Sequence, residues 1–246
     1  MSSQLTSGEA PRVFPPTRWS VVLAATQRPS PESAAALEAI CNAYWYPLYV
    51  YIRRCGRSVH DAQDLTQEFF RRLLEKRWLD SVDRNKGRLR SFLIVALKKF
   101  MFNEWDRLSA QRRGGGRTHA QIDTTFAESR LAADTHSLAP DETYDRQWAL
   151  TLISLTTNRL RAEFAAAGRP GDYDALKHCL LADRGAIDYA AVAAQLDVNA
   201  GTARVAVHRL RQRYRKLIQA EVASTVAGSE EAAEEMRHLF QVLSAG

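Results

Sequence analysis

Basic residues in this 246-residue chain gather in two segments whose chemistry suits a polyanion. Between Arg84 and Arg117 there are ten Lys and Arg residues, against the acidic Glu104 and Asp106. Residues 199–219 contain six basic residues and no acidic one. The formal net charge is +6, so the rest of the chain, with 18 basic and 26 acidic residues, is net acidic. Two separate basic segments favour a polyanion that is contacted at two places, because each neutralised phosphate releases counterions.

The second basic segment has the pattern of a helix-turn-helix. Residues 187–215 read IDYAAVAAQLDVNAGTARVAVHRLRQRYR, in which Asp188 and Asn199 are placed to cap two helices on either side of a tight turn at 197–199. Apolar residues form one stripe of the second helix: Ala203, Val207, Leu210, Tyr214 and Leu217. The opposite side is basic and begins with small residues, as entry into a major groove requires.

The residues of this segment that are expected to contact DNA are Gly201, Thr202, Arg204, Val205, His208, Arg209, Arg211 and Arg215. Arg204 is expected to bond guanine edges, and the later arginines are expected to hold phosphates. The alternative is an amphipathic helix with a solvated basic face, which is the commoner role of basic helices. The cap, the turn and the small residues occur together here, and this combination favours DNA binding.

Aromatic residues lie among the Lys and Arg residues of the first basic segment. Aromatic faces beside a basic groove are the usual means of holding unstacked bases, although aromatics at helical spacing are equally typical of a core. We expect Phe92 and Phe100 to be core residues, and Phe102 and Trp105 to stack on bases. The residues expected to bind DNA here are Arg88, Arg90, Lys98, Lys99, Phe102, Asn103, Trp105 and Arg107.

An acidic face is expected on the helix that opens near Ser58. His60, Asp61, Asp64 and Glu68 share it, and carboxylates with a histidine suit a metal ion, which would make a metal-dependent nuclease the best enzyme hypothesis. One helix cannot normally surround an ion, so we expect neither a metal site nor catalytic residues. The other interpretations are a solvated acidic face and a polar contact with another protein.

The elements that must position these residues all have helical periodicity. Helices are expected over 33–55, with Pro47 as a kink or restart, over 58–74 and 89–112, and again from Asp141 onward. The sequence therefore predicts an all-α fold of two helical domains joined by a flexible linker. The expected divisions are a flexible arm at 1–18, a first domain at 19–113, a linker at 114–140, a second domain at 141–220 and an acidic C-terminal extension at 221–246.

The extension is expected to contain a short helix, 230–243. Its apolar stripe consists of Met236, Leu239, Phe240 and Leu243, and its acidic residues are Glu230, Glu231, Glu234 and Glu235. The stripe either packs on the helix-turn-helix domain, which we favour, or masks the basic helix until a partner displaces it.

Composition favours a cytoplasmic protein. The three cysteines have no metal-site spacing and suit reduced thiols, and we find neither a leader-like N-terminus nor an apolar run of membrane-spanning length. No membrane association and no cofactor are expected.

Three motifs in order resemble the sigma-70 family, and specifically its extracytoplasmic-function (ECF) sigma factors. Residues 61–74, DAQDLTQEFFRRLL, resemble the region 2 helix that docks on core RNA polymerase. Residues 87–113, GRLRSFLIVALKKFMFNEWDRLSAQRR, resemble the segment that opens and reads the minus-ten element. Residues 189–217, YAAVAAQLDVNAGTARVAVHRLRQRYRKL, are similar to region 4, which reads the minus-thirty-five element. The turn position where the family commonly has glycine is occupied by Asp197.

The resemblance implies a detachable specificity subunit without catalytic residues or cofactor. Its partners would be core RNA polymerase and promoter DNA, and an anti-sigma protein is a further partner that the resemblance leaves open. It would be associated with the nucleoid when in the holoenzyme. The resemblance also favours polymerase contacts for Asp61, Asp64, Gln67 and Glu68. The main alternative is a stand-alone helix-turn-helix regulator whose first domain binds an effector or dimerises.

Overall fold

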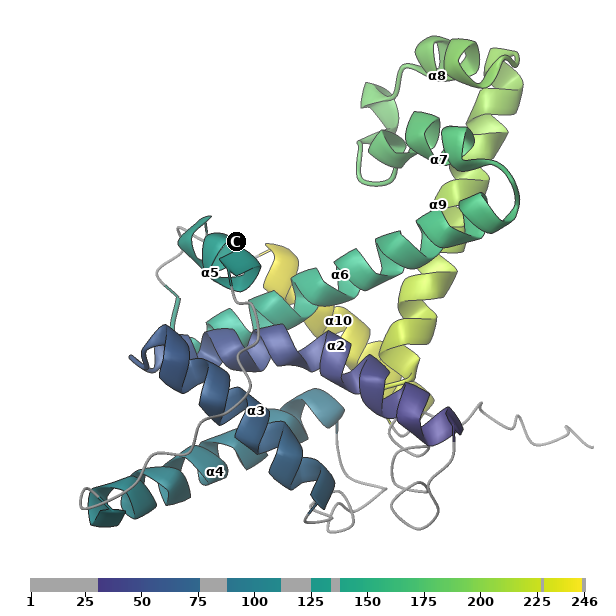
Figure 1. Cartoon of the computed structure of the whole chain (residues 1–246). Helices are drawn as coiled ribbons and strands as arrows, with labels where there is room; N and C mark the ends of the chain where they lie inside the picture. The colour runs from purple at the N-terminus through teal and green to yellow at the C-terminus, as the bar shows by residue number, and fades with distance from the viewer. Residues whose placement is uncertain (1–30, 76–87, 112–124, 134–137, 227, 245–246) are drawn as a thin grey trace, which may run out of the picture.

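Helices are the regular elements of the part of the chain that the computed structural model describes, which is residues 31–75, 88–111, 125–133, 138–226 and 228–244 (Figure 1). They are α2 (Pro31–Arg54), α3 (Val59–Glu75), α4 (Leu89–Gln111), α5 (Thr125–Ala133), α6 (Pro140–Ala166), α7 (Pro170–Leu176), α8 (Tyr189–Leu196), α9 (Ala200–Ala223) and α10 (Ser229–Ser244), with 3-10 turns η2 (Lys177–Cys179) and η3 (Arg184–Ala186). The predicted all-α class is confirmed for these residues. The predicted arm at 1–18 lies outside them.

The first three described helices match the expected ones closely, except at Pro47. Helix α2 continues through Pro47 without interruption, so the predicted restart is wrong. A proline inside a helix lacks one backbone donor, but Tyr44 and Leu48 on either side of Pro47 are fully buried. Their burial offsets the lost hydrogen bond and holds the helix together.

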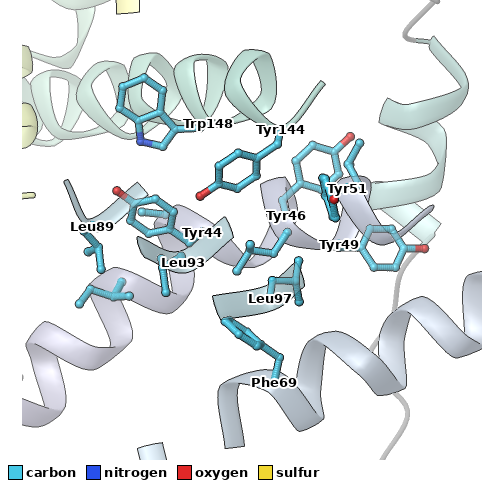
Figure 2. Packing of buried hydrophobic residues seen from close by; sticks show 14 of the residues in the cluster. Tyr44, Tyr46, Tyr49, Tyr51, Phe69, Leu89, Leu93, Leu97, Tyr144 and Trp148 are labelled. Carbon is cyan, nitrogen blue, oxygen red and sulfur yellow. The ribbon is translucent and has the colours of Figure 1, made fainter. Parts of the chain in front are cut away.

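A first hydrophobic core joins helices from both ends of the chain. Buried residues of α2, α3 and α4 meet there, and Tyr144 and Trp148 of α6 lie over Tyr44 (Figure 2). Ile218 and Val222 from the end of α9 belong to the same core, as does Leu239 of α10. This first core is therefore built on α2 but includes the last two helices.

A second hydrophobic core holds the helix-turn-helix. It consists of Leu160, Tyr173, Leu176, Cys179, Ile187, Val192, Ala193, Ala203, Val207, Leu210 and Leu217. Helices α6 and α9 each contribute to both cores and extend from one to the other (Figure 1). The expected division into domains at 114–140 is not where the cores divide, because the first half of α6 buries Tyr144 and Trp148 against α2.

The expected linker contains a helix that is tied to the first core. Helix α5 lies within 114–140, and its Glu128 accepts hydrogen bonds from Arg53 Nε at 2.8 Å and from the Tyr49 hydroxyl at 2.5 Å. Ala127 is buried in the first core. The prediction of a flexible segment is wrong for 125–133, because apolar and charged partners on α2 hold this helix.

Two further expectations concern the whole chain. Cys41, Cys55 and Cys179 form no disulfide. Of the helices that the structure describes, none combines the length and apolar character needed to cross a membrane.

Candidate functional site

The helix-turn-helix is set by two side-chain caps and one left-handed residue. The Asp188 carboxylate accepts hydrogen bonds from the N–H groups of Ala190 and Ala191, both at 3.0 Å. Asn199 caps α9 by accepting from Thr202 N–H at 2.8 Å. Between the two helices, Asp197 has φ 53° and ψ 48°, the left-handed conformation that ends α8. Both predicted caps and the predicted turn are confirmed.

Helix α9 buries one side and exposes the other. Ala203, Val207, Leu210 and Leu217 are buried in the second core, as their spacing predicted. The exposed side includes the candidate DNA-contacting residues Gly201, Thr202, Arg204, Val205, His208, Arg209 and Arg215. Val205 is 47% exposed, which leaves an apolar side chain beside the basic ones. This side of α9 can approach the major groove of DNA, because small residues stand at its beginning and basic residues follow them.

The charge on this side of α9 is largely uncompensated. Within the described part of the chain, Arg209 and Arg215 have no carboxylate partner. Arg213, on the same helix, is different because its guanidinium pairs with Glu163 of α6 through contacts of 2.6 and 2.7 Å. Arg209 and Arg215 are therefore available to an anion, whereas Arg213 is already neutralised.

Arg211 does not belong to the exposed basic side, contrary to the sequence-based expectation. Its Nε donates to the carbonyl oxygen of Cys179 at 2.8 Å, and its other end donates to the carbonyl of Ala182. Those carbonyls follow α7, where the chain turns before η3. Arg211 therefore closes the turn between α7 and α8, and phosphate binding is not its role in this conformation.

Helix α4 presents a second candidate surface. Its exposed residues lie on one side of the helix: Val95, Lys98, Lys99, Phe102 and Asn103. Phe102 is 67% exposed, whereas Phe100 is buried and Phe92 is half-buried against the first core, as expected. Lys98 lies 2.7 Å from Asp141. Trp105 and Arg107 lie on the same helix, but their side chains are outside those that the structure describes.

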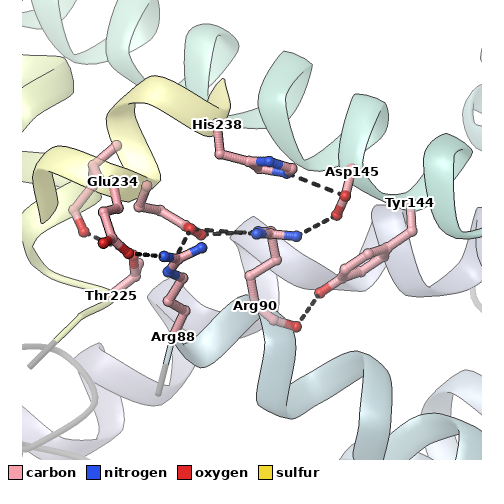
Figure 3. A network of polar contacts seen from close by, with 9 residues as sticks. Arg88, Arg90, Tyr144, Asp145, Thr225, Glu234 and His238 are labelled. Carbon is pink, nitrogen blue, oxygen red and sulfur yellow. Dashed lines mark hydrogen bonds and ion pairs between the residues drawn. The ribbon is translucent and has the colours of Figure 1, made fainter. Parts of the chain in front are cut away.

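Arg88 and Arg90 are directed into the protein, which corrects their expected role at the DNA surface. Arg90 is 7% exposed, and its guanidinium bonds Glu235 of α10 and Asp145 of α6 (Figure 3). Arg88 pairs with Glu234. Burial alone would lower the pKa of Arg90, but the hydrogen bond and charge of Glu235 raise it above its ordinary value. Arg90 is therefore an internal charge in this conformation, and Arg88 is a partly exposed one that is already paired with a carboxylate.

The C-terminal extension forms the predicted helix, and it packs on α6 and α9, which carry most of the expected helix-turn-helix domain. Leu239 of α10 is buried in the first core, with Met236 and Leu243 packed against it and Phe240 left exposed. His238 lies 3.2 Å from Asp145, and the N–H of Leu89 donates to the carbonyl of Thr225 at 3.1 Å. The carboxylates of α10 thus pair with the arginines at the beginning of α4. Its apolar stripe packs on the parts of α6 and α9 that lie in the first core, and it does not cover the recognition side of α9.

The acidic face of α3 is divided among different partners. Ser58 Oγ accepts from Asp61 N–H at 3.1 Å and caps the helix, and His60 lies 3.7 Å from Asp64. Glu68 accepts hydrogen bonds from Arg71 and Arg72, and the bond from Arg71 is the main cause that lowers its pKa from 4.5 to about 2. Asp61 is exposed, and Asp64, Gln67 and Glu68 are half-buried.

The same helix was the candidate for a metal site. Among the described residues, no three His, Cys, Asp or Glu side chains are grouped so that they could hold a metal ion.

Two features of these surfaces were missed by sequence reasoning. The guanidinium carbon of Arg204 lies 5.1 Å from the centroid of the Tyr189 ring, a contact between the first residue of α8 and the second turn of α9. A Tyr directly after a cap and an Arg 15 positions later would have been the only local signal. The pairing of Arg88 and Arg90 with Glu234 and Glu235 joins residues about 145 positions apart, for which a single sequence gives no signal.

Comparison with protein-family models, with curated proteins and with solved structures finds no match to this chain.

Proposed function

We propose that this chain is a transcription initiation factor of the ECF sigma type, which binds core RNA polymerase and directs it to specific promoters. The observation that carries the proposal is the exposed side of α9. It combines a capped helix start, Arg204 and Val205 near that start, and, further along, Arg209 and Arg215, which pair with no carboxylate among the described residues. A helix of this kind can read base edges with its beginning and hold phosphates with the rest.

The exposed side of α4 supports a second contact with DNA. Phe102 offers an aromatic face to solvent, and Lys98 and Lys99 flank it on the same helix. An unstacked base can lie on such a face while Lys99 neutralises its phosphate, whereas Lys98 is already paired with Asp141. A repressor needs only one DNA-reading helix, so a second surface suited to single strands favours a factor that acts where the duplex opens.

The exposed part of α3 supports the protein contact that a polymerase would require. Asp61 and His60 are exposed at the start of this helix, and its apolar side is fixed in the first core by Ala62 and Phe69. The rigid helix therefore displays polar side chains that a basic or polar surface of core polymerase could bind.

The test begins with recovery of core RNA polymerase on the full-length chain. The resulting holoenzyme is then used to select bound fragments from genomic DNA, and the selected fragments serve as templates for run-off transcription. We expect transcripts that require this protein and start at one place on each template. Transcription that is unchanged when the protein is left out would contradict the proposal.

Matched arginine variants of α9 sharpen this test. Arg209→Ala combined with Arg215→Ala should lower promoter-dependent transcription, because neither guanidinium has a carboxylate partner in the part of the chain that the structure describes. Arg213→Ala is the control on the same helix, since its guanidinium is held by Glu163. Equal losses in the control and in the double variant would show a general effect on α9 instead of DNA contact.

A second candidate, a stand-alone helix-turn-helix regulator, is favoured by one observation. Helices α6 and α9 continue from one core to the other, and α10 ties the end of the chain to α4, so the described helices form a connected unit. A regulator that works without polymerase needs no separation of its parts. Stable binding to a duplex operator without core polymerase, together with failure to recover core, would favour this candidate.

A further inference from the structure

We infer that Tyr189 is a positioning residue for Arg204, and that it holds the arginine ready to read a guanine; this rests on the proposed function. Arg204 stands in the second turn of α9, and its guanidinium carbon lies 5.1 Å from the centre of the Tyr189 ring. A cation over an aromatic face at this distance is attracted by the ring. Tyr189 thereby becomes part of the reading surface, although it stands on the first helix of the motif.

The Tyr189 ring is a fixed support. Tyr189 is the first residue of α8 and lies between the Asp188 cap and the two N–H groups, of Ala190 and Ala191, that donate to the Asp188 carboxylate. The ring also packs against the second core. One side of it is therefore anchored in the protein while the other is offered to Arg204.

Arg204 has no competing partner in the part of the chain that the structure describes. No carboxylate pairs with it, in contrast to Arg213, and the Tyr189 ring is the group that it contacts. A long side chain that is free in solution loses rotamer entropy when it binds, and a side chain already held in place loses less. The contact leaves the N–H groups at the edge of the guanidinium available for the O6 and N7 atoms of guanine.

This arrangement predicts that base preference and non-specific DNA binding depend on different residues, which can be measured separately. Removing the ring should weaken the preference for guanine at the base pair that Arg204 reads. The phosphate contacts of Arg209 and Arg215 do not depend on the ring, so non-specific binding and its salt dependence should stay the same.

The experiment selects duplexes from a pool with a randomised window of about 10 base pairs, one turn of B-DNA. The selection is carried out twice, with the full-length chain alone and with the chain bound to core RNA polymerase. The variants are then tested under the condition in which the wild-type chain enriches a consensus sequence. Arg204→Ala identifies the base pair that Arg204 reads, as the position whose preference disappears. Tyr189→Leu should lower the guanine preference at that position about fivefold, or ~1 kcal/mol, and leave the other positions unchanged.

Two further variants separate positioning from other roles of Tyr189. Tyr189→Phe keeps the aromatic face and should keep the guanine preference. A loss in Tyr189→Phe as large as in Tyr189→Leu would assign the effect to the hydroxyl and overturn the inference. If Tyr189→Leu does not fold, Tyr189→Met replaces it, because methionine fills irregular apolar gaps. In the Arg204→Ala background, Tyr189→Leu should have no additional effect on base preference.

The failures of the two proposals are distinguishable. No enriched consensus from the wild-type chain under either condition overturns the proposed function, and this inference with it. A wild-type consensus whose guanine preference survives the loss of the Tyr189 ring overturns this inference alone.

Discussion

Glu235 is fully buried, and its carboxylate accepts two hydrogen bonds from the guanidinium of Arg90, at 2.9 and 3.3 Å. The two residues stand on α10 and α4, so their contact ties the end of the chain to the first core. Asp145 of α6 bonds the same guanidinium (Figure 3). The guanidinium carbon of Arg90 lies 5.0 Å from the centroid of the Trp148 ring. Three helices from distant parts of the sequence are thus joined by one buried charge.

Breaking this pair should be costly, because a buried charge that loses its partner is not resolvated. We expect Glu235→Gln to lower the free energy of unfolding by about 3 kcal/mol, measured by urea denaturation. Glu230→Gln, an exposed residue of the same helix, is the control and should change it by about 0.5 kcal/mol or less. In a double-mutant cycle, the combined change Arg90→Met and Glu235→Leu should lower the free energy of unfolding by less than the sum of the two single changes. Additive losses would show that the pair is not coupled.

Glu68 should make stability depend on pH in the acid range. Hydrogen bonds from Arg71, and then from Arg72, hold its folded pKa at about 2, below the ordinary 4.5. A lowered folded pKa means that the stabilisation is complete above about pH 4.5 and is lost as the pH falls towards 2. Glu68→Gln should therefore be less stable than wild type at neutral pH and lose less stability between pH 4.5 and 2.

Urea midpoints measured at several pH values between 2 and 7 test this dependence. Glu38→Gln, at an exposed position of α2, is the control and should follow the wild-type curve. Parallel curves for Glu68→Gln and wild type would show that Glu68 makes no such contribution.

Arg211 and Arg215 lie one turn apart on α9 and should have opposite effects. Arg211→Ala removes the donors to the carbonyls of Cys179 and Ala182, and we expect a loss of about 2 kcal/mol in unfolding free energy. Arg215→Ala removes no hydrogen bond or ion pair within the described residues, so the free energy of unfolding should not change. The slope of log affinity against log salt should fall by about 1. Urea denaturation and duplex binding at several salt concentrations measure both quantities. Exchanged effects would mean that Arg211 faces DNA after all.

Phe100 and Phe102 form a second matched pair. Phe100 is buried in the first core, so Phe100→Ala should cost about 3–5 kcal/mol of stability. Phe102 is 67% exposed, so Phe102→Ala should leave stability nearly unchanged and weaken binding to a single-stranded oligonucleotide by about 1–3 kcal/mol. Val95→Ala, on the same exposed side, removes an apolar group without an aromatic face and is the control. A loss of binding equal to that of Phe102→Ala would exclude stacking as the cause.

The features that depend on residues close together in the sequence were predicted well. Asp188 and Asn199 were recognisable as caps because a cap acts on donors only two or three positions away. The buried stripe of α9 and the exposed Phe102 follow from helical spacing, which depends on one helix alone. Elements whose positions are decided within one or two turns are therefore readable from the sequence.

Contacts between distant segments could not be predicted in this way. Glu234 and Glu235 were recognised only as acidic residues beside the apolar stripe of the C-terminal helix, and only folding brings them to Arg88 and Arg90. Helix α6 was assigned to the second domain because a flexible linker was expected before it, but the aromatic side chains in its first half pack in the same core as α2. Arg211 was misassigned because carbonyl acceptors at a chain turn leave no mark in the sequence.

Asp197 offers the most direct test of the turn between α8 and α9. Its φ of 53° places an L-residue in the left-handed region, where the Cβ atom crowds the backbone and only glycine is unstrained. Asp197→Gly should relieve this strain, and the flexible unfolded chain offsets part of the gain, so we expect a net stabilisation of at most about 1 kcal/mol. Asp197→Asn should be nearly neutral, because asparagine tolerates this conformation. Asp197→Val should lose about 1–2 kcal/mol, since a β-branched residue tolerates it worst. Urea denaturation of the four proteins should therefore give the glycine variant the highest free energy of unfolding, the wild type and the asparagine variant similar values, and the valine variant the lowest. A valine variant as stable as the glycine variant would mean that the turn has another conformation.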